Sequence, residues 1–334
     1  MSNRQRYLVI GSGSIARRHI ANLKRIFEAC EVACVSASGR PLTEDETGAT
    51  RVFDNLASAI DWKPTFGIVA SPAPFHASNA AALLEHGIPV LIEKPLSDAL
   101  EHFSGNAEVL SRHREWIEVG YNLRYLSSAV RFKELLDGGT VGRIHSVLID
   151  MGQYLPDWRP GTDYRANVSA RKELGGGVLL ELSHEFDYLT WLFGKFDEAY
   201  CVISRSGMLE IDVEDKADIM FFRDDGMVAQ LHMDFLQRKA TRNCKVIGEH
   251  GNLVWDLIAN SISLHTGQAT ECLFDESHVD RNDMYINQLR RFALVAAGKA
   301  TPLVGLDDAL YTLKLIEALR HSSAERQPVS LREF

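Results

Sequence analysis

The sequence predicts an α/β protein in two parts: a doubly wound parallel sheet, then an α+β part whose large, mainly antiparallel sheet is open on one face. Strand and helix patterns alternate up to about residue 122, and strand patterns then follow one another directly. The chain of 334 residues also exceeds the ~250–300 residues at which single cores stop growing. We therefore expect one domain over residues 1–122 and a second over residues 123–334.

Short apolar runs, each followed by a turn and a helical pattern, characterise the first part. This alternation is typical of buried parallel strands covered by helices on both faces. The expected strands cover residues 7–10, 31–36, 66–70, 89–92 and 116–120, and the expected helices cover residues 14–29, 55–60 and 76–86.

Consecutive strand patterns characterise the second part. The turn signal Asp224-Asp225-Gly226 lies between two of them and predicts a hairpin. About six strands are expected, over residues 144–154, 199–205, 217–223, 227–235, 241–248 and 251–255. Helices are expected over residues 178–192 and 305–321, and the second of these is expected to pack back near the first part.

Charge and composition exclude several classes of partner. Lys and Arg number 36 against 45 Asp and Glu, a net charge of −9 that disfavours nucleic acid and anionic membranes but allows a small anionic ligand held by local arginines. The polar residues 1–6 precede an apolar run too short for a signal peptide, and no run approaches the ~18 residues of a membrane span. Five cysteines without a C-x-x-C pair indicate free thiols. We expect a cytoplasmic protein.

A glycine-rich turn joins the first expected strand to the first expected helix. It matches G-x-G-x-x-G/A, the fingerprint of dinucleotide-binding Rossmann domains. The first glycine permits the tight turn, the second leaves room for a pyrophosphate, and the alanine lets the helix approach the strand, while the helix N-terminus favours the anion. The cofactor-binding residues expected here are Gly11, Ser12, Gly13, Ser14, Ile15 and Ala16.

The position that distinguishes NAD from NADP lies about 20 residues after the third small residue of this motif. It is occupied by Ser36, followed by Ser38 and Arg40, and no carboxylate occurs before Glu44. An acid would repel a 2′-phosphate, whereas two hydroxyls and an arginine would bind one. We expect NADP in preference to NAD; the alternative is NAD binding beside an ordinary polar loop.

Glu93-Lys94-Pro95 follows the expected strand 89–92, at the carboxyl end where doubly wound sheets bind ligands. A lysine partly removed from water at such a place can exchange a proton with an alcohol. Spacing alone fits a surface lysine better. A catalytic role for Lys94 is indicated only by the motif together with the other motifs of the chain.

Further motifs follow in a specific order. They are Ser-Pro-Ala-Pro-Phe-His at 71–76, Glu-Lys-Pro at 93–95, Gly-Tyr-Asn-Leu-Arg-Tyr at 120–125, three glycines at 175–177 with His-Glu-Phe-Asp at 184–187, and Asp-Asp-Ala at 307–309. With the glycine-rich turn, and over nearly the whole chain, this set resembles the Gfo/Idh/MocA family, named after glucose–fructose oxidoreductase, inositol dehydrogenase and rhizopine catabolism.

The resemblance implies roles for individual residues. Lys94 would lie beside the nicotinamide and the reacting carbon, where it would bind substrate and transfer a proton, and the bond before Pro95 would be cis. Arg124 would touch the substrate at the domain junction. The cofactor-binding residues implied are Ser71, Pro72, His76, Glu93, Lys94 and Asn122.

A second catalytic signature is only partly present. Family members commonly carry Asp and His four residues apart on one helix face; here His184 has Leu180 at that spacing and Glu181 three residues before it. On a continuous helix Glu181 would share a face with His184, which makes His184 a catalytic candidate and Glu181 a substrate-binding one. The alternatives are a one-residue slip or a core histidine. A metal site is not expected, because two ligands are too few.

Residues 153–165 form an aromatic and basic loop pattern after a strand. Aromatic faces stack on sugar rings and arginines bind carboxylate or phosphate, although a surface loop held by its aromatics is the alternative. The expected substrate-binding residues are Trp158, Arg159, Tyr164 and Arg165, with Arg171 and Lys172 close behind.

The sequence thus predicts hydride transfer between NAD(P) and a sugar-like secondary alcohol or ketone. A nucleotide sugar or acidic sugar of surface-polysaccharide synthesis suits the basic loop. Two alternatives stay open, a non-catalytic dinucleotide-binding regulator and a reductase of a non-sugar substrate. The open sheet face predicts a homodimer or homotetramer.

Overall fold

A computed structural model describes residues 5–333, so residues 1–4 of the polar N-terminal stretch lie outside the described part. The chain divides into two compact units, Met1–Asn122 with Asn282–Leu313, and Leu123–Arg281 with Lys314–Phe334. The first division falls at residue 122, as expected from the sequence. Residues 282–313 were expected in the second domain and lie instead in the first unit, because their apolar side chains complete its cores.

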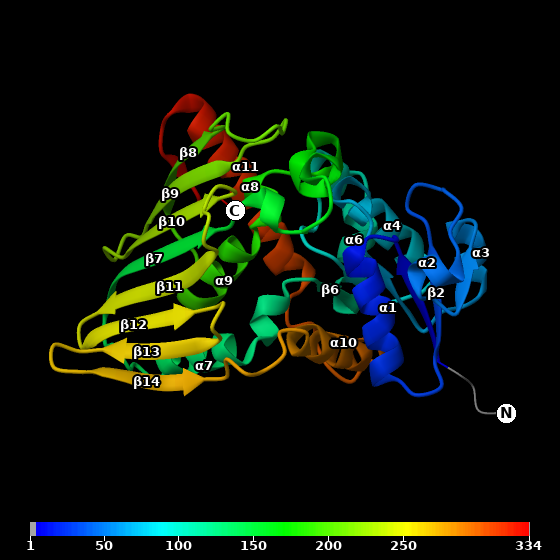
Figure 1. Cartoon of the computed structure of the whole chain (residues 1–334), viewed down its shortest axis with the longest axis horizontal. Helices are drawn as coiled ribbons and strands as arrows, with labels where there is room; N and C mark the ends of the chain where they lie inside the picture. The colour runs from blue at the N-terminus through cyan, green and yellow to red at the C-terminus, as the bar shows by residue number, and fades with distance from the viewer. Residues whose placement is uncertain (1–4, 334) are drawn as a thin grey trace. The chain divides into compact units, whose positions relative to one another are not determined.

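The sheet of the first unit is parallel throughout and has the strand order β3-β2-β1-β4-β5-β6. This is the order of a Rossmann fold, with the reversal between β1 and β4. The strands β2 and β6 of this sheet are labelled in Figure 1. The strands are β1 (Arg6–Ile10), β2 (Glu31–Val35), β3 (Arg51–Phe53), β4 (Phe66–Val69), β5 (Val90–Ile92) and β6 (Ile117–Val119). Five of them match expected strands, and β3, with only three residues at the edge, was missed.

The helices of the first unit come from between its strands and from the later segment of residues 282–313. The helices of the first unit are α1 (Ser14–Ile26), α2 (Glu44–Thr47), α3 (Leu56–Asp61), α4 (His76–Leu84), α5 (Leu100–Ser104), α6 (Ala107–Arg112) and α10 (Asp283–Ala296), with 3₁₀ turns η1 (Ala73–Phe75) and η2 (Arg114–Trp116). Helix α10 packs against α1, and α11 (Leu306–Glu325) begins in this unit.

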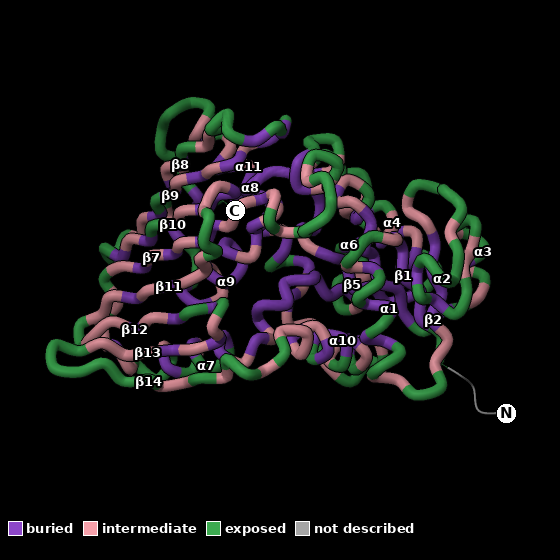
Figure 2. Tube along the Cα trace, in the orientation of Figure 1, coloured by how far each residue is buried: buried purple, intermediate pink, exposed green. Residues whose placement is uncertain are grey.

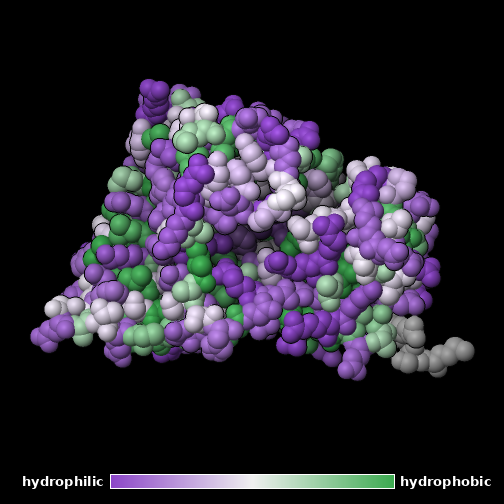
Figure 3. Space-filling model, viewed as in Figure 1, coloured by the Kyte–Doolittle hydropathy of each residue, from purple (hydrophilic) through white to green (hydrophobic). Residues whose placement is uncertain are grey.

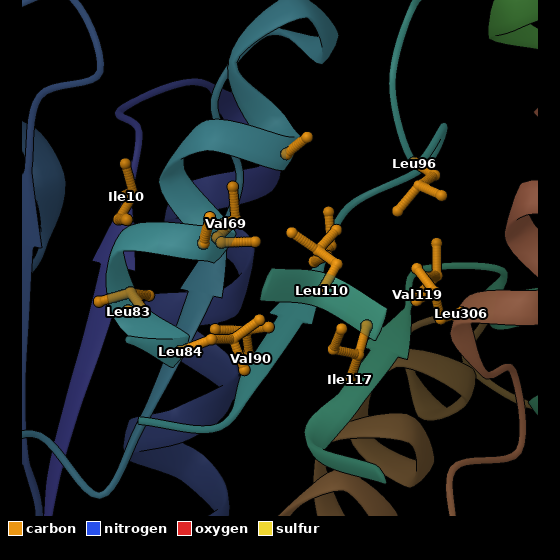
Figure 4. Packing of buried hydrophobic residues seen from close by; sticks show 14 of the residues in the cluster. Ile10, Val69, Leu83, Leu84, Val90, Leu96, Leu110, Ile117, Val119 and Leu306 are labelled. Atoms are coloured by element: carbon orange, nitrogen blue, oxygen red, sulfur yellow. The ribbon is translucent and has the colours of Figure 1, made fainter. Parts of the chain in front are cut away.

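Two apolar clusters hold the first unit together. In one, Val90 and Val119 of the sheet pack with Leu84 of α4, Leu110 of α6 and Leu306 of α11 (Figure 4). The other contains residues of α1 and of α10. In Figure 2 much of the sheet of the first unit is coloured as buried, whereas many of its connecting loops are exposed. The cores therefore need side chains from both ends of the sequence.

The sheet of the second unit has nine strands in the order β14-β13-β12-β11-β7-β10-β9-β8-β15. All neighbours are antiparallel except β7 and β10, which are parallel. The strands are β7 (Ile144–Gly152), β8 (Glu198–Ser204), β9 (Lys216–Phe222), β10 (Val228–Asp234), β11 (Thr241–Gly248), β12 (Gly251–Asp256), β13 (Ser261–His265), β14 (Thr270–Asp275) and β15 (Val329–Ser330). The six expected strands and the β9–β10 hairpin are confirmed; β13, β14 and β15 were missed.

The helices of the second unit differ from expectation at one important place. The helix expected over residues 178–192 is two helices, because residues 182–183 form a turn. The helices are α7 (Ser127–Asp137), α8 (Val178–Glu181), α9 (His184–Phe193) and the second part of α11, with 3₁₀ turns η3 (Asn122–Tyr125), η4 (Leu155–Asp157), η5 (Tyr164–Ala166), η6 (Val168–Ala170) and η7 (Lys172–Leu174). No helix within residues 5–333 has the length and hydropathy needed to cross a bilayer.

One face of the large sheet is a shallow depression lined by alternate residues of β7 to β11. Val202 and Met220 on it are 44% and 37% exposed, and Figure 3 shows hydrophobic residues interspersed with hydrophilic ones over these strands. His232 lies among acids there, with Nδ1 2.6 Å from Asp218 and Nε2 2.9 Å from Asp234. These hydrogen bonds raise the pKa of His232 to about 9.

Replacing His232 with Gln should destabilise the protein in a pH-dependent way. Because the folded pKa of about 9 lies above the ordinary 6.5, the pairing stabilises fully below about pH 6.5 and is lost as the pH rises through 9. We expect the melting temperature of His232→Gln to lie below wild type at pH 6 and to converge with it near pH 10. His145→Gln, an exposed change on β7, is the control; a gap independent of pH would contradict the assignment.

Candidate active site

The glycine-rich turn between β1 and α1 has the geometry of a phosphate-binding loop. Gly11 has φ +120°, and a Cβ placed there would lie 2.3 Å from the Ala70 carbonyl oxygen. A Cβ on Gly13 would meet nothing within 4 Å, so this residue leaves open space in front of the helix. The first turn of α1 has no capping side chain and no acid. Its N–H groups and dipole therefore suit an anion such as a pyrophosphate.

The loop after β2 lies beside this turn. Ser36 and Ser38 hydrogen-bond to each other through their hydroxyls at 3.2 Å, and Nη2 of Arg40 donates to Ser12 Oγ at 3.2 Å. Arg40 also donates through both Nη atoms to the carboxylate of Glu46. The residues expected to select the cofactor are thus brought together at the phosphate loop.

Glu46 is a site residue that the sequence reasoning missed. It lies on α2, whose N-cap Thr43 accepts a hydrogen bond from the Glu46 N–H at 3.2 Å. The signal was available, because Thr-x-x-Glu is the capping-box pattern that starts a helix and turns the chain back. The loop of residues 36–40 contains no acid of its own, but the carboxylate of Glu46 contacts it through Arg40.

Glu93 is buried and ionised next to Lys94. The carboxylate Oε1 of Glu93 lies 2.6 Å from Nε2 of His19 on α1. Gly120 lies against the other side of the carboxylate, since a Cβ on this residue would be only 3.0 Å from Oε2. Burial tends to raise the pKa of Glu93, but the hydrogen bond from His19 and the charge of Lys94 outweigh it, and the pKa is lowered. The Lys94–Pro95 bond is cis, as the resemblance implied. Lys94 itself is half-buried.

His19 is the second residue that the sequence reasoning missed, since it lies within the expected helix 14–29 and belongs to none of the motifs. A histidine at a fully buried helical position requires a polar partner, and that requirement was the available signal. Its partner Glu93 lies 74 positions away, a distance that no local pattern bridges.

Both ring nitrogens of His76 lie within hydrogen-bond distance of backbone carbonyl oxygens. Nδ1 lies 2.7 Å from the Pro95 carbonyl oxygen, and Nε2 lies 2.7 Å from that of Ser71. Burial lowers the pKa of His76, against the two carbonyls that favour the protonated ring. The side chain is 1% exposed. His76 therefore ties the turn after β4, with half-buried Pro72, to the turn after β5, and does not offer a ring nitrogen to a cofactor.

The second unit holds the other candidate residues. His184 is the first residue of α9, and Glu181 is the last of α8. Because the two helices are separated by a turn, the argument that Glu181 and His184 share one continuous helix face was wrong. Both side chains are partly exposed.

Arg124 does not have the free guanidinium expected of a substrate-binding residue. Its Nε and Nη2 donate to the two carboxylate oxygens of Asp187 at 3.0 and 2.7 Å, and the side chains are 5% and 1% exposed. Glu185 of the same helix is held in the same way by Arg242. The pairs fix the first turn of α9, on which His184 lies. Asn122, expected near Arg124, is buried at the end of the first unit.

The loop at residues 153–177 is folded by its own aromatic and charged groups. Trp158 donates from Nε1 to the Gln153 carbonyl at 3.0 Å, and the Tyr164 hydroxyl accepts from the Glu210 N–H at 3.2 Å. Arg165 pairs with Asp163 and Glu210, which raise its pKa. Arg159 is exposed. The basic character seen in the sequence is therefore partly balanced by acids.

Comparison with known proteins identifies the family. Residues 5–121 match the oxidoreductase family with an NAD-binding Rossmann fold, and residues 129–254 match the GFO/IDH/MocA C-terminal domain. The chain belongs to the Gfo/Idh/MocA family. The second matched segment ends at residue 254, before residues 282–313, which belong to the first unit.

Relatives within the Gfo/Idh/MocA family align over almost the whole chain. Inositol 2-dehydrogenase 2 of Saccharopolyspora erythraea is 26% identical over 95% of this chain and 92% of its own length. The 1,5-anhydro-D-fructose reductase of Ensifer adhaerens is 24% identical over 98% of both chains. The WlbA dehydrogenase of Bordetella pertussis, solved with NADH and UDP-GlcNAcA, superposes with a TM-score of 0.81 over 98% of this chain and 99% of its own, at 19% identity. The fold of this protein is therefore that of a Gfo/Idh/MocA oxidoreductase.

Proposed function

We propose that the protein is an NAD(P)-dependent dehydrogenase or reductase that transfers a hydride between nicotinamide and a secondary alcohol or ketone of a sugar derivative. The observation that carries this proposal is the buried Glu93–His19 pair beside Lys94, at the carboxyl edge of the sheet whose first strand ends in the phosphate loop. A buried carboxylate is costly to keep away from water unless it is hydrogen-bonded, so the presence of Glu93 beside Lys94 supports a functional role for this place.

The strand order gives the direction in which a dinucleotide would lie. Along the sheet, β2, β1, β4 and β5 are successive neighbours. At about 4.8 Å per strand, the Arg40 loop after β2 and Lys94 after β5 are separated by about 14 Å, with the phosphate loop between them. The adenosine ribose would lie near Ser36, Ser38 and Arg40, and the nicotinamide near Lys94.

The reaction then needs few groups from the protein. The nicotinamide, when bound, supplies or accepts the hydride. Lys94 would hold the substrate oxygen and exchange a proton with it, and His184 of the second unit is the other acid–base candidate. Glu93 would contact the cofactor ribose, and His76 would act as a positioning residue by joining the Ser71 and Pro95 backbones.

A sugar-like substrate is supported by the activities of the relatives named above and by the aromatic loop with Trp158 and Tyr164. Arg159 and Lys172 are both exposed and can pair with an acidic or nucleotide-linked sugar, while Arg165 would first have to leave Asp163 and Glu210. Glu181 remains a proposed substrate contact. Of the groups in this loop, Arg159 and Lys172 are thus stronger candidates than Arg165 for binding an anionic substituent.

A screen of NADH and NADPH oxidation with keto sugars, uronic acids and nucleotide sugars tests the proposal. We expect turnover with at least one sugar derivative. Dinucleotide binding without turnover across the panel would favour the non-catalytic regulator, and turnover confined to non-sugar ketones would favour the second alternative.

We further propose NADP as the favoured cofactor, with NAD as the alternative. Replacing Arg40 with Ala should weaken NADP⁺ binding about tenfold and NAD⁺ binding less than twofold, because the guanidinium can pair with the 2′-phosphate only. Calorimetric titration of both dinucleotides measures this. Equal weakening of the two would contradict the NADP preference, and Arg51→Ala on β3 serves as a control for lost surface charge.

The open face of the large sheet supports a proposed homodimer or homotetramer. Val202 and Met220 leave apolar surface exposed, and charged residues such as Lys245 and Asp218 on the same face offer pairing to a second copy. Sedimentation at micromolar concentration should give a mass at least twice that of the chain, and a monomer would contradict the proposal.

A further inference from the structure

The guanidinium of Arg40, a cation beside the expected ribose site, is held by a carboxylate of its own chain. Both Nη atoms donate to Glu46, and Nη2 also donates to Ser12 Oγ of the phosphate loop at 3.2 Å. The Arg40 and Glu46 side chains are 48% and 39% exposed. An ion pair this exposed contributes little to folding, so a stronger ligand can displace it.

The Arg40–Glu46 pair affects the binding of NADP and of NAD in opposite ways. A 2′-phosphate carries up to two negative charges and would compete with the Glu46 carboxylate for Arg40 while being repelled by it. A ribose with free hydroxyls meets no such repulsion, and a carboxylate at this place is the group that accepts hydrogen bonds from a ribose 2′-hydroxyl. The same side chain thus works against NADP and in favour of NAD.

Helix α2 gives Glu46 a fixed position for this role. Thr43 caps the helix through the Glu46 N–H, and Gly48 ends it in the left-handed conformation with φ +70°. The carboxylate is therefore presented from a short, capped turn. Arg40 and Glu46 are only six positions apart, so the contact is local and forms without a ligand.

We propose that Glu46 is a specificity-determining residue that limits the preference for NADP by competing for Arg40 and by accepting the ribose of NAD. The inference rests on the proposed dinucleotide-dependent function. In the wild type it makes the protein accept both dinucleotides, and loss of the carboxylate makes the protein selective for NADP.

Titration calorimetry of the full chain with NADP⁺ and NAD⁺ tests the inference without any substrate. In Glu46→Gln, NADP⁺ affinity should rise about tenfold and NAD⁺ affinity should fall about threefold. Adenosine 2′,5′-bisphosphate, which lacks the nicotinamide, should gain as much as NADP⁺. The matched control is Glu44→Gln, the same charge change on the same helix, for which both affinities should stay within twofold of wild type.

Adding Arg40→Ala to Glu46→Gln separates competition from plain repulsion. The gain in NADP⁺ affinity should shrink to less than about twofold when Arg40 is absent. An unchanged NADP⁺ to NAD⁺ ratio in Glu46→Gln, a shift of equal size in Glu44→Gln, or a full gain without Arg40 would each overturn the inference while leaving the proposed function standing. A wild type that binds neither dinucleotide would overturn the proposed function, and the inference with it.

Discussion

Lys94→Ala is expected to lower kcat by at least ~100-fold while leaving the affinity for NAD⁺ and NADP⁺ within about threefold of wild type. Positioned acid–base groups contribute at least that factor. The phosphate loop, which would hold the pyrophosphate of the dinucleotide, is untouched by the change. Steady-state kinetics with the substrate found in the screen, together with calorimetric titration of the dinucleotides, measure both quantities.

Lys94→Arg separates charge from proton exchange. Arginine keeps the positive charge but is not deprotonated in proteins, so this variant should be nearly as slow as the alanine variant if Lys94 transfers a proton. Lys24→Ala, an exposed change on α1, is the control and should retain full activity. Near-normal turnover in Lys94→Ala would show that the lysine has no part in the chemistry.

Asp187→Asn is expected to destabilise the protein by about 3–5 kcal/mol, the usual result of leaving a buried charge without its partner. The change leaves Arg124, 5% exposed, with no carboxylate in the bidentate pair. Because the pair fixes the first turn of α9, the second unit should unfold at lower urea concentration. Urea unfolding followed by tryptophan fluorescence suits the test, since Trp191 packs near Arg124.

Glu108→Gln provides the matched control for this loss. Glu108 pairs with Arg112 on α6 at 2.6 Å, but its side chain is 86% exposed, so the expected cost is about 0–1 kcal/mol. A double variant, Arg124→Met with Asp187→Leu, should recover much of the stability, because apolar residues of similar volume replace a buried pair with little loss. Equal small losses in Asp187→Asn and Glu108→Gln would contradict the importance of burial here.

Local patterns were sufficient to predict the first sheet and the cofactor loop. The apolar run before Gly11, the turn and the helix are close in sequence, and their geometry is set within a dozen residues. The strand β3 was missed because three residues at a sheet edge carry almost no periodicity. The strand β14 was missed because its residues are mostly exposed and lack the alternation of half-buried strands. The strand β13 does alternate polar and apolar residues over Ser261–His265, and this signal was overlooked.

The parts of the site that could not be predicted depend on contacts distant in sequence or on side-chain direction. His19 on α1 and Glu93 after β5 are 74 positions apart in the sequence, and only the folded first unit brings their side chains to 2.6 Å. Nothing in the sequence indicates that Arg124 and Asp187 bind each other; the fold brings their side chains together as a buried ion pair. The turn at residues 182–183 replaces a helix that periodicity alone would continue, since the residues around it are apolar on all sides. The position of Glu46 on a short helix could have been predicted, because the capping pattern Thr-x-x-Glu at residues 43–46 is visible in the sequence.

The return of residues 282–313 to the first unit has a consequence for how the chain matures during synthesis. The Rossmann sheet is complete by residue 119, but Phe292 and Leu306, which belong to its two cores, leave the ribosome only after the whole second sheet up to β14 has been made. Domains usually fold in order as they emerge. Here the first unit lacks part of its two cores while about 160 residues of the other unit are translated, so the cofactor site, although it is encoded first, is completed only late in synthesis.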